Sequence, residues 1–101
     1  MNNFTTIEKY AIIKVLYHIM KADGVIHPKE EEYMDKTYIN FSISINDLEE
    51  ISNIDEIQTK QIISGMSDDN KNKALSLFIG IAEADGFLHP KEKGIINHFF
   101  I

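Results

Sequence analysis

The residues of this sequence whose types and spacing could do chemistry lie in two copies of one short acidic motif. Residues 22–30 read ADGVIHPKE and residues 84–92 read ADGFLHPKE, so seven of the nine positions are identical. Each copy contains an aspartate that is followed, seven residues later, by a glutamate. Carboxylate oxygens are the ligands that hard divalent cations prefer. The candidate metal ligands are therefore Asp23, Glu30, Asp85 and Glu92.

The types of ligand available restrict the choice of ion. Four carboxylates brought close together repel one another, so either some of them stay protonated or a cation compensates them. The sequence contains no cysteine, and oxygen ligands without sulfur favour Ca²⁺, Mg²⁺ or Mn²⁺. His27 and His89, one in each copy, leave Zn²⁺ or Ni²⁺ as the less favoured choice.

A calcium-binding EF-hand loop is the first alternative to consider. The spacing Asp-Gly-x-Ile-x-x-x-Glu in the first copy reproduces the second half of such a loop. The first half needs oxygen ligands at loop positions 1 and 3, but the first copy has Ile19 and Lys21 there. The second copy has Ile81 and Glu83. An EF-hand is therefore disfavoured.

Helix capping offers a competing explanation that needs no metal. If His27 is the N-cap and Pro28 the first helical residue, Glu30 stands at N3, where its carboxylate can accept from the backbone N–H of the cap. The second copy repeats this arrangement, and the aspartates could accept from loop amides. Capping does not by itself require the aspartates, which favours ion binding, but an ancestral duplication could preserve both copies without function. Both interpretations stay open.

Glycine and proline divide each copy in the same way. Gly24 and Gly86 stand where a helix can end in the left-handed conformation. Pro28 and Pro90 stand where the next helix can begin. The chain is therefore predicted to contain an internally duplicated helix-loop-helix.

The flanking segments have the periodicity of helices. Residues 4–22 and 68–84 are apolar on more than one side, which predicts two central helices. Residues 28–39 and 90–100 carry narrower apolar stripes, so we expect them to pack against the central pair from outside.

The same stripes predict where the acids point. Both aspartates extend the apolar stripe of the helix before them, and both glutamates begin the inner stripe of the helix after them. Glu31 and Glu32 fall off that face. If the two copies pack around an approximate two-fold axis, the four candidate ligands converge near one rim of the core.

Between the two copies the pattern is less regular. Serine, asparagine and aspartate residues at 42–47 supply turn and N-cap chemistry before a short helix that includes 48–51. A longer helix is predicted over 54–66, with an inner face formed by Ile54, Ile57, Gln61, Ile62 and Gly65. Ser67 then supplies the cap of the next helix. No stretch alternates at period two, so the predicted fold is an all-α bundle of about six helices.

Composition limits the remaining possibilities. A chain of 101 residues, 44% of them hydrophobic, suffices for one compact domain spanning 1–101. Its net charge of −6 leaves no basic patch for nucleic acid. The longest apolar runs, such as 77–82, are far shorter than the roughly 20 residues of a membrane span. The N-terminal residues lack the features of a secretory signal, so a cytoplasmic location is expected.

The duplicated phrase Ala-Asp-Gly-x-aliphatic-x-x-x-Glu, once after each of two apolar helices, resembles the TerB-like tellurite-resistance family. The resemblance covers nearly the whole chain and is strongest over 10–38 and 62–100. It implies a compact helical fold and a role in tellurite resistance or a broader stress response. It also implies a metal site made by the repeated acids, which are here Asp23, Glu30, Asp85 and Glu92. The absence of cysteine argues against reduction of tellurite by thiols of this chain.

Two functions follow from these observations. The favoured one is a non-enzymatic module in which a cation clamps the two copies together and stabilises a surface for a protein partner. The alternative is a metal-free interaction domain that makes contacts through Tyr33, Tyr38 and Phe41, although core packing explains these aromatic residues more simply.

An enzyme is disfavoured, because no nucleophile-elbow, phosphate-loop or zinc-protease signature occurs. His18 and His98 are expected at helix surfaces or boundaries.

Overall fold

Six helices make up the computed structural model, which describes residues 4–22, 24, 27–84 and 90–100. No strand occurs within these ranges, so the predicted all-α class is confirmed. The helices are α1 (Thr6–Lys21), α2 (Pro28–Asn40), α3 (Ile45–Ser52), α4 (Glu56–Ser64), α5 (Asp68–Ala82) and α6 (Pro90–Phe100).

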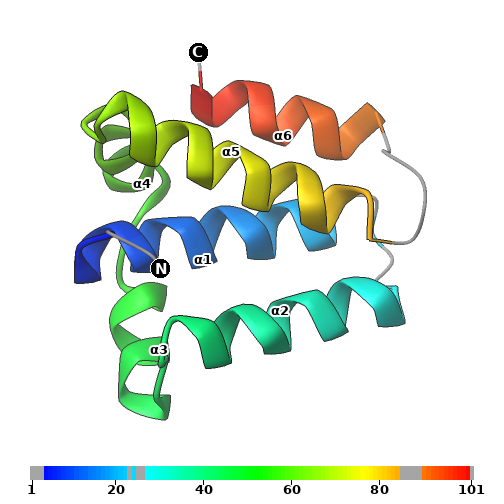
Figure 1. Ribbon diagram of the computed structural model, residues 1–101, viewed down its shortest axis with the longest axis horizontal. Coiled ribbons are helices and arrows are strands. Elements are labelled where there is room, and N and C mark those ends of the chain that lie inside the picture. The colour runs from blue at the N-terminus through cyan, green and yellow to red at the C-terminus, as the bar shows by residue number, and fades with distance from the viewer. Residues whose placement is uncertain (1–3, 23, 25–26, 85–89, 101) are drawn as a thin grey trace.

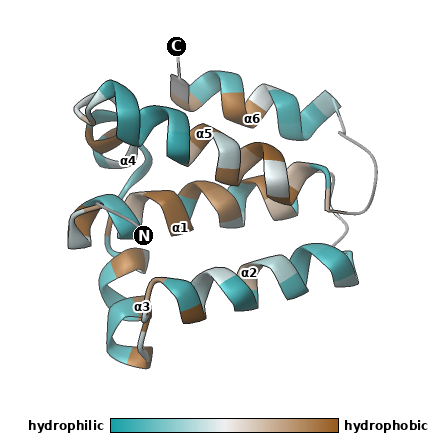
Figure 2. Ribbon diagram, viewed as in Figure 1, coloured by the Kyte–Doolittle hydropathy of each residue, from teal (hydrophilic) through white to brown (hydrophobic). Residues whose placement is uncertain are grey.

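Helix α1 occupies the centre of the molecule and contacts every other helix. In Figure 1, α5 and α6 lie on one side of α1, and α2 and α3 lie on the other. Its buried residues are therefore distributed around the helix, as Ala11, Ile12, Ile13, Val15, Leu16, Ile19 and Met20. Figure 2 shows the complementary pattern, in which hydrophilic residues cover most of α2. The radius of gyration, 12.5 Å, is close to the roughly 13 Å of a compact domain of this length.

Local capping determines where four of the helices begin. The N-cap side chains of Thr5, Ser44, Asp55 and Ser67 each accept from the backbone N–H three residues later. These bonds satisfy amides that have no partner inside the helix. The predicted cap at Ser67 is confirmed, and the predicted short helix is α3, which begins after Ser44.

The inner face predicted for α4 is only partly confirmed. Ile54 is buried and Ile62 packs against the core, but Gln61 and Gly65 are exposed. The side chain of Ile57 is 70% exposed, whereas Thr59 and Ile63 are buried at 0% and 1%. The prediction placed Ile54 inside the helix, but Asp55 is the N-cap and α4 begins after it. Thr59 can be buried because its hydroxyl donates to the carbonyl oxygen of Asp55 at 2.8 Å.

The aromatic residues considered for a partner surface belong mainly to the core. Phe41 is 4% exposed and packs edge-on against Phe4, with ring centroids 5.9 Å apart. Tyr33 and Tyr38 are partly buried and pack against the core. Core packing therefore explains these three side chains.

Candidate metal centre

The two candidate glutamates are buried, as their stripes predicted. The side chains of Glu30 and Glu92 are 0% and 2% exposed. Glu31 and Glu32, which were predicted to fall off the inner face, are exposed. Glu30 is the third residue of α2, and Glu92 is the third residue of α6. The duplication in the sequence therefore corresponds to two buried carboxyl groups at equivalent positions of two helices.

The predicted capping contact is present at the start of α2. His27 is the N-cap, and its backbone N–H donates to Glu30 Oε1 at 3.4 Å. Gly24 has a φ of +79°, so the chain leaves α1 through the left-handed conformation predicted for this glycine. His89 lies outside the described residues, although α6 begins at Pro90 as predicted. Capping and burial thus coexist at Glu30, and one does not exclude the other.

The helices that lead into the two motifs end in buried stripes. Every member of the predicted stripes is 0% exposed, namely Ile12, Leu16 and Ile19 in α1 and Ala74, Phe78 and Ile81 in α5. Asp23 and Asp85, the candidate ligands that follow these stripes, lie outside the described residues.

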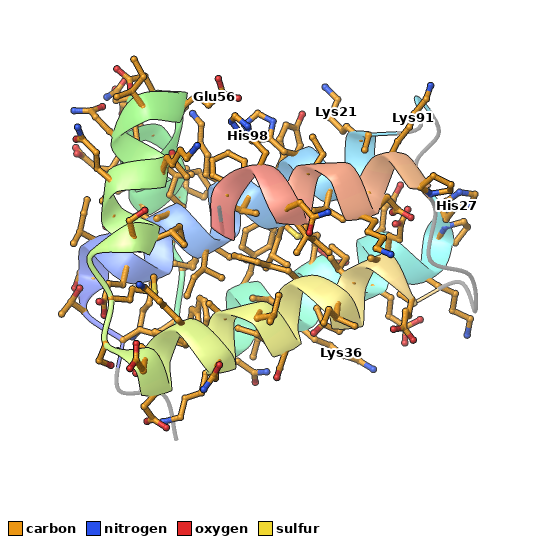
Figure 3. All side chains as sticks on the ribbon, turned by 90° about the horizontal axis from the view of Figure 1, so that it is seen from above. Lys21, His27, Lys36, Glu56, Lys91 and His98 are labelled. Atoms are coloured by element: carbon orange, nitrogen blue, oxygen red, sulfur yellow. The ribbon has the colours of Figure 1, made fainter. Side chains whose placement is uncertain are left out.

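The helix ends that flank the two motifs lie at the same end of the molecule. Figure 1 shows the C-terminal ends of α1 and α5 and the N-terminal ends of α2 and α6 gathered at one end. In Figure 3, His27 at the start of α2 and Lys91 at the start of α6 lie at this end. Contacts between α1 and α6, and between α2 and α5, hold the two copies together.

The electrostatic environment of the two carboxyl groups combines burial with helix dipoles. The Oε2 atoms of Glu30 and Glu92 are buried. Both groups lie in the first turn of a helix, where the partial positive charge of the N-terminus favours an anion. A buried carboxylate needs such compensation, because removal from water disfavours its charged form.

The described residues supply part of the proposed ligand set. Within the described ranges, no three histidine, aspartate or glutamate side chains form a group that could hold a metal ion. Glu30 and Glu92 have the oxygen chemistry that suits a hard cation. A site of the kind proposed from the sequence would take its other two ligands from Asp23 and Asp85.

The two other histidines occupy the positions expected for them. His98 is exposed and lies 3.5 Å from a carboxylate oxygen of Glu56. His18 is half-buried and stacks on Phe99, with ring centroids 6.2 Å apart.

No signal in the sequence predicted the contacts that hold α3 against α1. The Tyr10 hydroxyl donates to Asp47 at the start of α3. One turn later in α1, the Lys14 ammonium donates to the carbonyl oxygens of Ile51 and Ser52 near the end of α3, at 3.3 Å each. Backbone acceptors have no sequence signature, so these bonds were not predictable.

Comparison with protein-family models, curated proteins and solved structures gives no match to this chain. Among the described helices, none is long and apolar enough to cross a membrane.

Proposed function

We propose that this chain is a non-enzymatic, divalent-cation-binding helical module of the TerB-like type. In this proposal one ion, Ca²⁺, Mg²⁺ or Mn²⁺, is shared by Asp23, Glu30, Asp85 and Glu92. The observation that carries the proposal is the burial of Glu30 and Glu92 at equivalent positions of two helices that start at the same end of the molecule.

Burial of carboxyl groups favours an ion because a buried negative charge is costly unless it is compensated. The backbone N–H of His27 provides one compensating bond to Glu30. A divalent cation would compensate two carboxylates at once, and its hard character suits their oxygens. The same ion would join the loop between α1 and α2 to the loop between α5 and α6.

The resulting function is structural. A cation that joins the two copies would stabilise their relative placement, and with it a surface that a protein partner recognises. The resemblance to the TerB-like family adds tellurite resistance or a broader stress response as the setting for this role.

Thermal unfolding with and without Ca²⁺, Mg²⁺ and Mn²⁺ tests the proposal. An ion at 100 times its Kd adds about 2.7 kcal/mol to the free energy of unfolding, which raises the Tm by about 10 °C or more for a domain of this size. The double variant Asp23→Asn with Asp85→Asn should remain folded and lose this rise. The matched control, Glu31→Gln with Glu32→Gln, removes two exposed acids and should keep it.

A metal-free interaction domain is the second candidate function. It is favoured by large apolar side chains at the surface, among them Ile39 at 76% and Ile45 at 85% exposure. If no divalent ion changes the Tm of the wild-type protein, the ion-binding proposal fails and this function replaces it.

A further inference from the structure

A cavity of about 280 Å³ lies where α1, α2 and α3 meet, away from the two acidic motifs. The side chains of Tyr17 and Leu48 at its wall are 45% and 43% exposed, so the cavity opens to solvent between them. The rest of its lining includes Ile13, Lys14, His18, Tyr38 and Ile51. Nothing in the proposed ion-binding function uses this cavity.

The wall that α3 contributes is fixed in place. Tyr10 binds Asp47 at the start of α3, and Lys14 binds the carbonyl oxygens of Ile51 and Ser52 near its end. Because both ends of this short helix are attached to α1, the cavity is formed before any ligand arrives. A preformed cavity reduces the entropy lost on binding.

The lining is apolar with a basic edge. Hydrocarbon and aromatic groups form most of the surface, and the polar groups include the Lys14 ammonium and the His18 imidazole. None of the described residues that line the cavity is acidic, although the chain has 16 acidic residues and 10 basic ones. This local charge is opposite to that of the whole chain.

Burial lowers the pKa of His18, and the positive charges of Lys14 and Lys21 lower it further. The negative charge of Glu56 acts in the opposite direction and raises it. At pH 7 the imidazole is therefore mainly neutral, since its pKa lies below the ordinary value of 6.5. It can donate one hydrogen bond without adding a second charge.

We propose that this cavity binds a small carboxylic acid whose body is one aromatic ring or an aliphatic group of similar size. A closed apolar cavity of about 150 Å³ holds one benzene molecule. A volume of 280 Å³ therefore accommodates a ring together with a short chain. The apolar body lies against Ile13, Leu48 and Ile51, and the carboxylate faces Lys14.

Lys14 is suited to hold the carboxylate. Its ammonium group has three N–H donors, and its two bonds to backbone carbonyls are long, at 3.3 Å. A carboxylate is a stronger acceptor than a peptide carbonyl, so it can take the third donor or replace a long bond. A cationic ligand of the same shape would meet the Lys14 charge directly and be repelled.

Titration of the ¹⁵N-labelled protein with 4-phenylbutyrate, followed by amide NMR spectra, tests this proposal. 4-Phenylbutylamine serves as the probe of the same shape and opposite charge, and 4-phenylbutanol as the neutral probe. We expect shifts confined to residues around the cavity, and a Kd for the acid about tenfold or more below that of the amine. Equal binding of acid and amine, or no binding of any probe, would overturn the proposal.

Four variants connect such binding to the cavity. Leu48→Trp places an indole at the exposed mouth and should abolish binding while the spectrum stays dispersed. Ile57→Trp introduces the same indole at an exposed position of α4 and should leave the Kd of the acid unchanged. Lys14→Met should remove the preference for the acid over the alcohol, and Lys14→Arg should retain it. Acid binding that survives Leu48→Trp, or an unchanged preference in Lys14→Met, would also overturn the proposal.

Discussion

The ring of Tyr33 in α2 lies directly on Gly80 in α5. A Cβ atom added to Gly80 would stand 2.9 Å from Cζ of Tyr33, a distance that real Cβ contacts essentially never show, and 3.1 Å from Cε2, which is tighter than most such contacts. The missing side chain therefore permits the close approach of two helices that belong to different copies of the duplicated motif.

Gly80→Ala should lower the stability of the protein although alanine favours helices. The added methyl group displaces the Tyr33 ring, and overpacking of this kind costs about 1–3 kcal/mol, whereas the gain in helix propensity is about 1 kcal/mol. Thermal unfolding should show a lower Tm. In a Tyr33→Ala background the overlap is absent, so the same substitution should raise the Tm instead.

Gly94→Ala is the matched control for this substitution. Gly94 lies in α6, and a Cβ added there has nothing within 4 Å. Its replacement should stabilise the protein by about 1 kcal/mol. If Gly80→Ala raises the Tm as much as Gly94→Ala does, the contact with Tyr33 does not constrain the packing of α2 on α5.

The bond between Tyr10 and Asp47 should make stability depend on pH in the acidic range. The Tyr10 hydroxyl, followed by bonds from the Ser44 backbone and side chain, holds the pKa of Asp47 below its ordinary value of 3.8. Because the pKa is lower in the folded state, the stabilisation is fully present above pH 3.8. It is lost as the pH falls through the folded-state value.

Tyr10→Phe removes one of these bonds and should lower the Tm at neutral pH. The difference between wild type and variant should shrink as the pH falls below 3.8, which thermal unfolding between pH 7 and pH 2 can measure. Tyr17→Phe, a change at a half-exposed tyrosine farther along α1, should give a difference that does not vary over this range. A constant difference for Tyr10→Phe would show that its hydroxyl does not stabilise the Asp47 carboxylate.

The observed inner face of α4 predicts unequal costs for two isoleucines of the same helix. Ile63→Ala empties a site that is 1% exposed and should cost about 2–5 kcal/mol. Ile57→Ala, at a position that is 70% exposed, should cost less than about 0.5 kcal/mol. Urea unfolding measures both values. Similar costs would contradict the observed face, and a larger cost for Ile57→Ala would support the face expected from the sequence.

If the ion-binding proposal holds, the effect of Glu30→Gln on the Tm should depend on whether the ion is present. The glutamine carbonyl can still accept from the His27 N–H, so the cap is kept, and one buried negative charge is removed. Without divalent ions the Tm should therefore be equal to or higher than that of the wild type. At a saturating ion concentration it should be lower, because one ligand is lost.

Glu31→Gln, at the neighbouring exposed position, should behave as the wild type under both conditions. An ion-induced rise in Tm that is as large in Glu30→Gln as in the wild type would remove Glu30 from the ligand set.

Local signals made much of the fold predictable. Pro28 and Pro90 determine the first residues of α2 and α6, and Ser67 determines the start of α5, because helix starts depend on a few adjacent residues. The inward direction of Glu30 and Glu92 follows from the same helical periodicity.

Features that depend on distant neighbours were not predictable in this way. Ile57 and Ile63 both fit apolar helical spacing, and packing against α1 and α6 decides which of them is buried. The cavity beside α3 depends on hydrogen bonds from Lys14 to two backbone carbonyl oxygens. Every residue has a carbonyl oxygen, so the sequence does not indicate which ones Lys14 binds. For the candidate site, the sequence indicates that two glutamates point inward, but a shared ion depends on how one copy packs on the other.

The central position of α1 has a consequence for synthesis on the ribosome. Helix α1 is made first, but α4, α5 and α6, which cover much of it, begin at residue 56 and later. At about 5–20 residues per second, the nascent chain carries its most apolar helix partly uncovered for several seconds before α6 emerges. Helix α6 must therefore emerge before the core around α1 can close, and removal of α4, α5 and α6 would leave the apolar surface of α1 exposed to other chains.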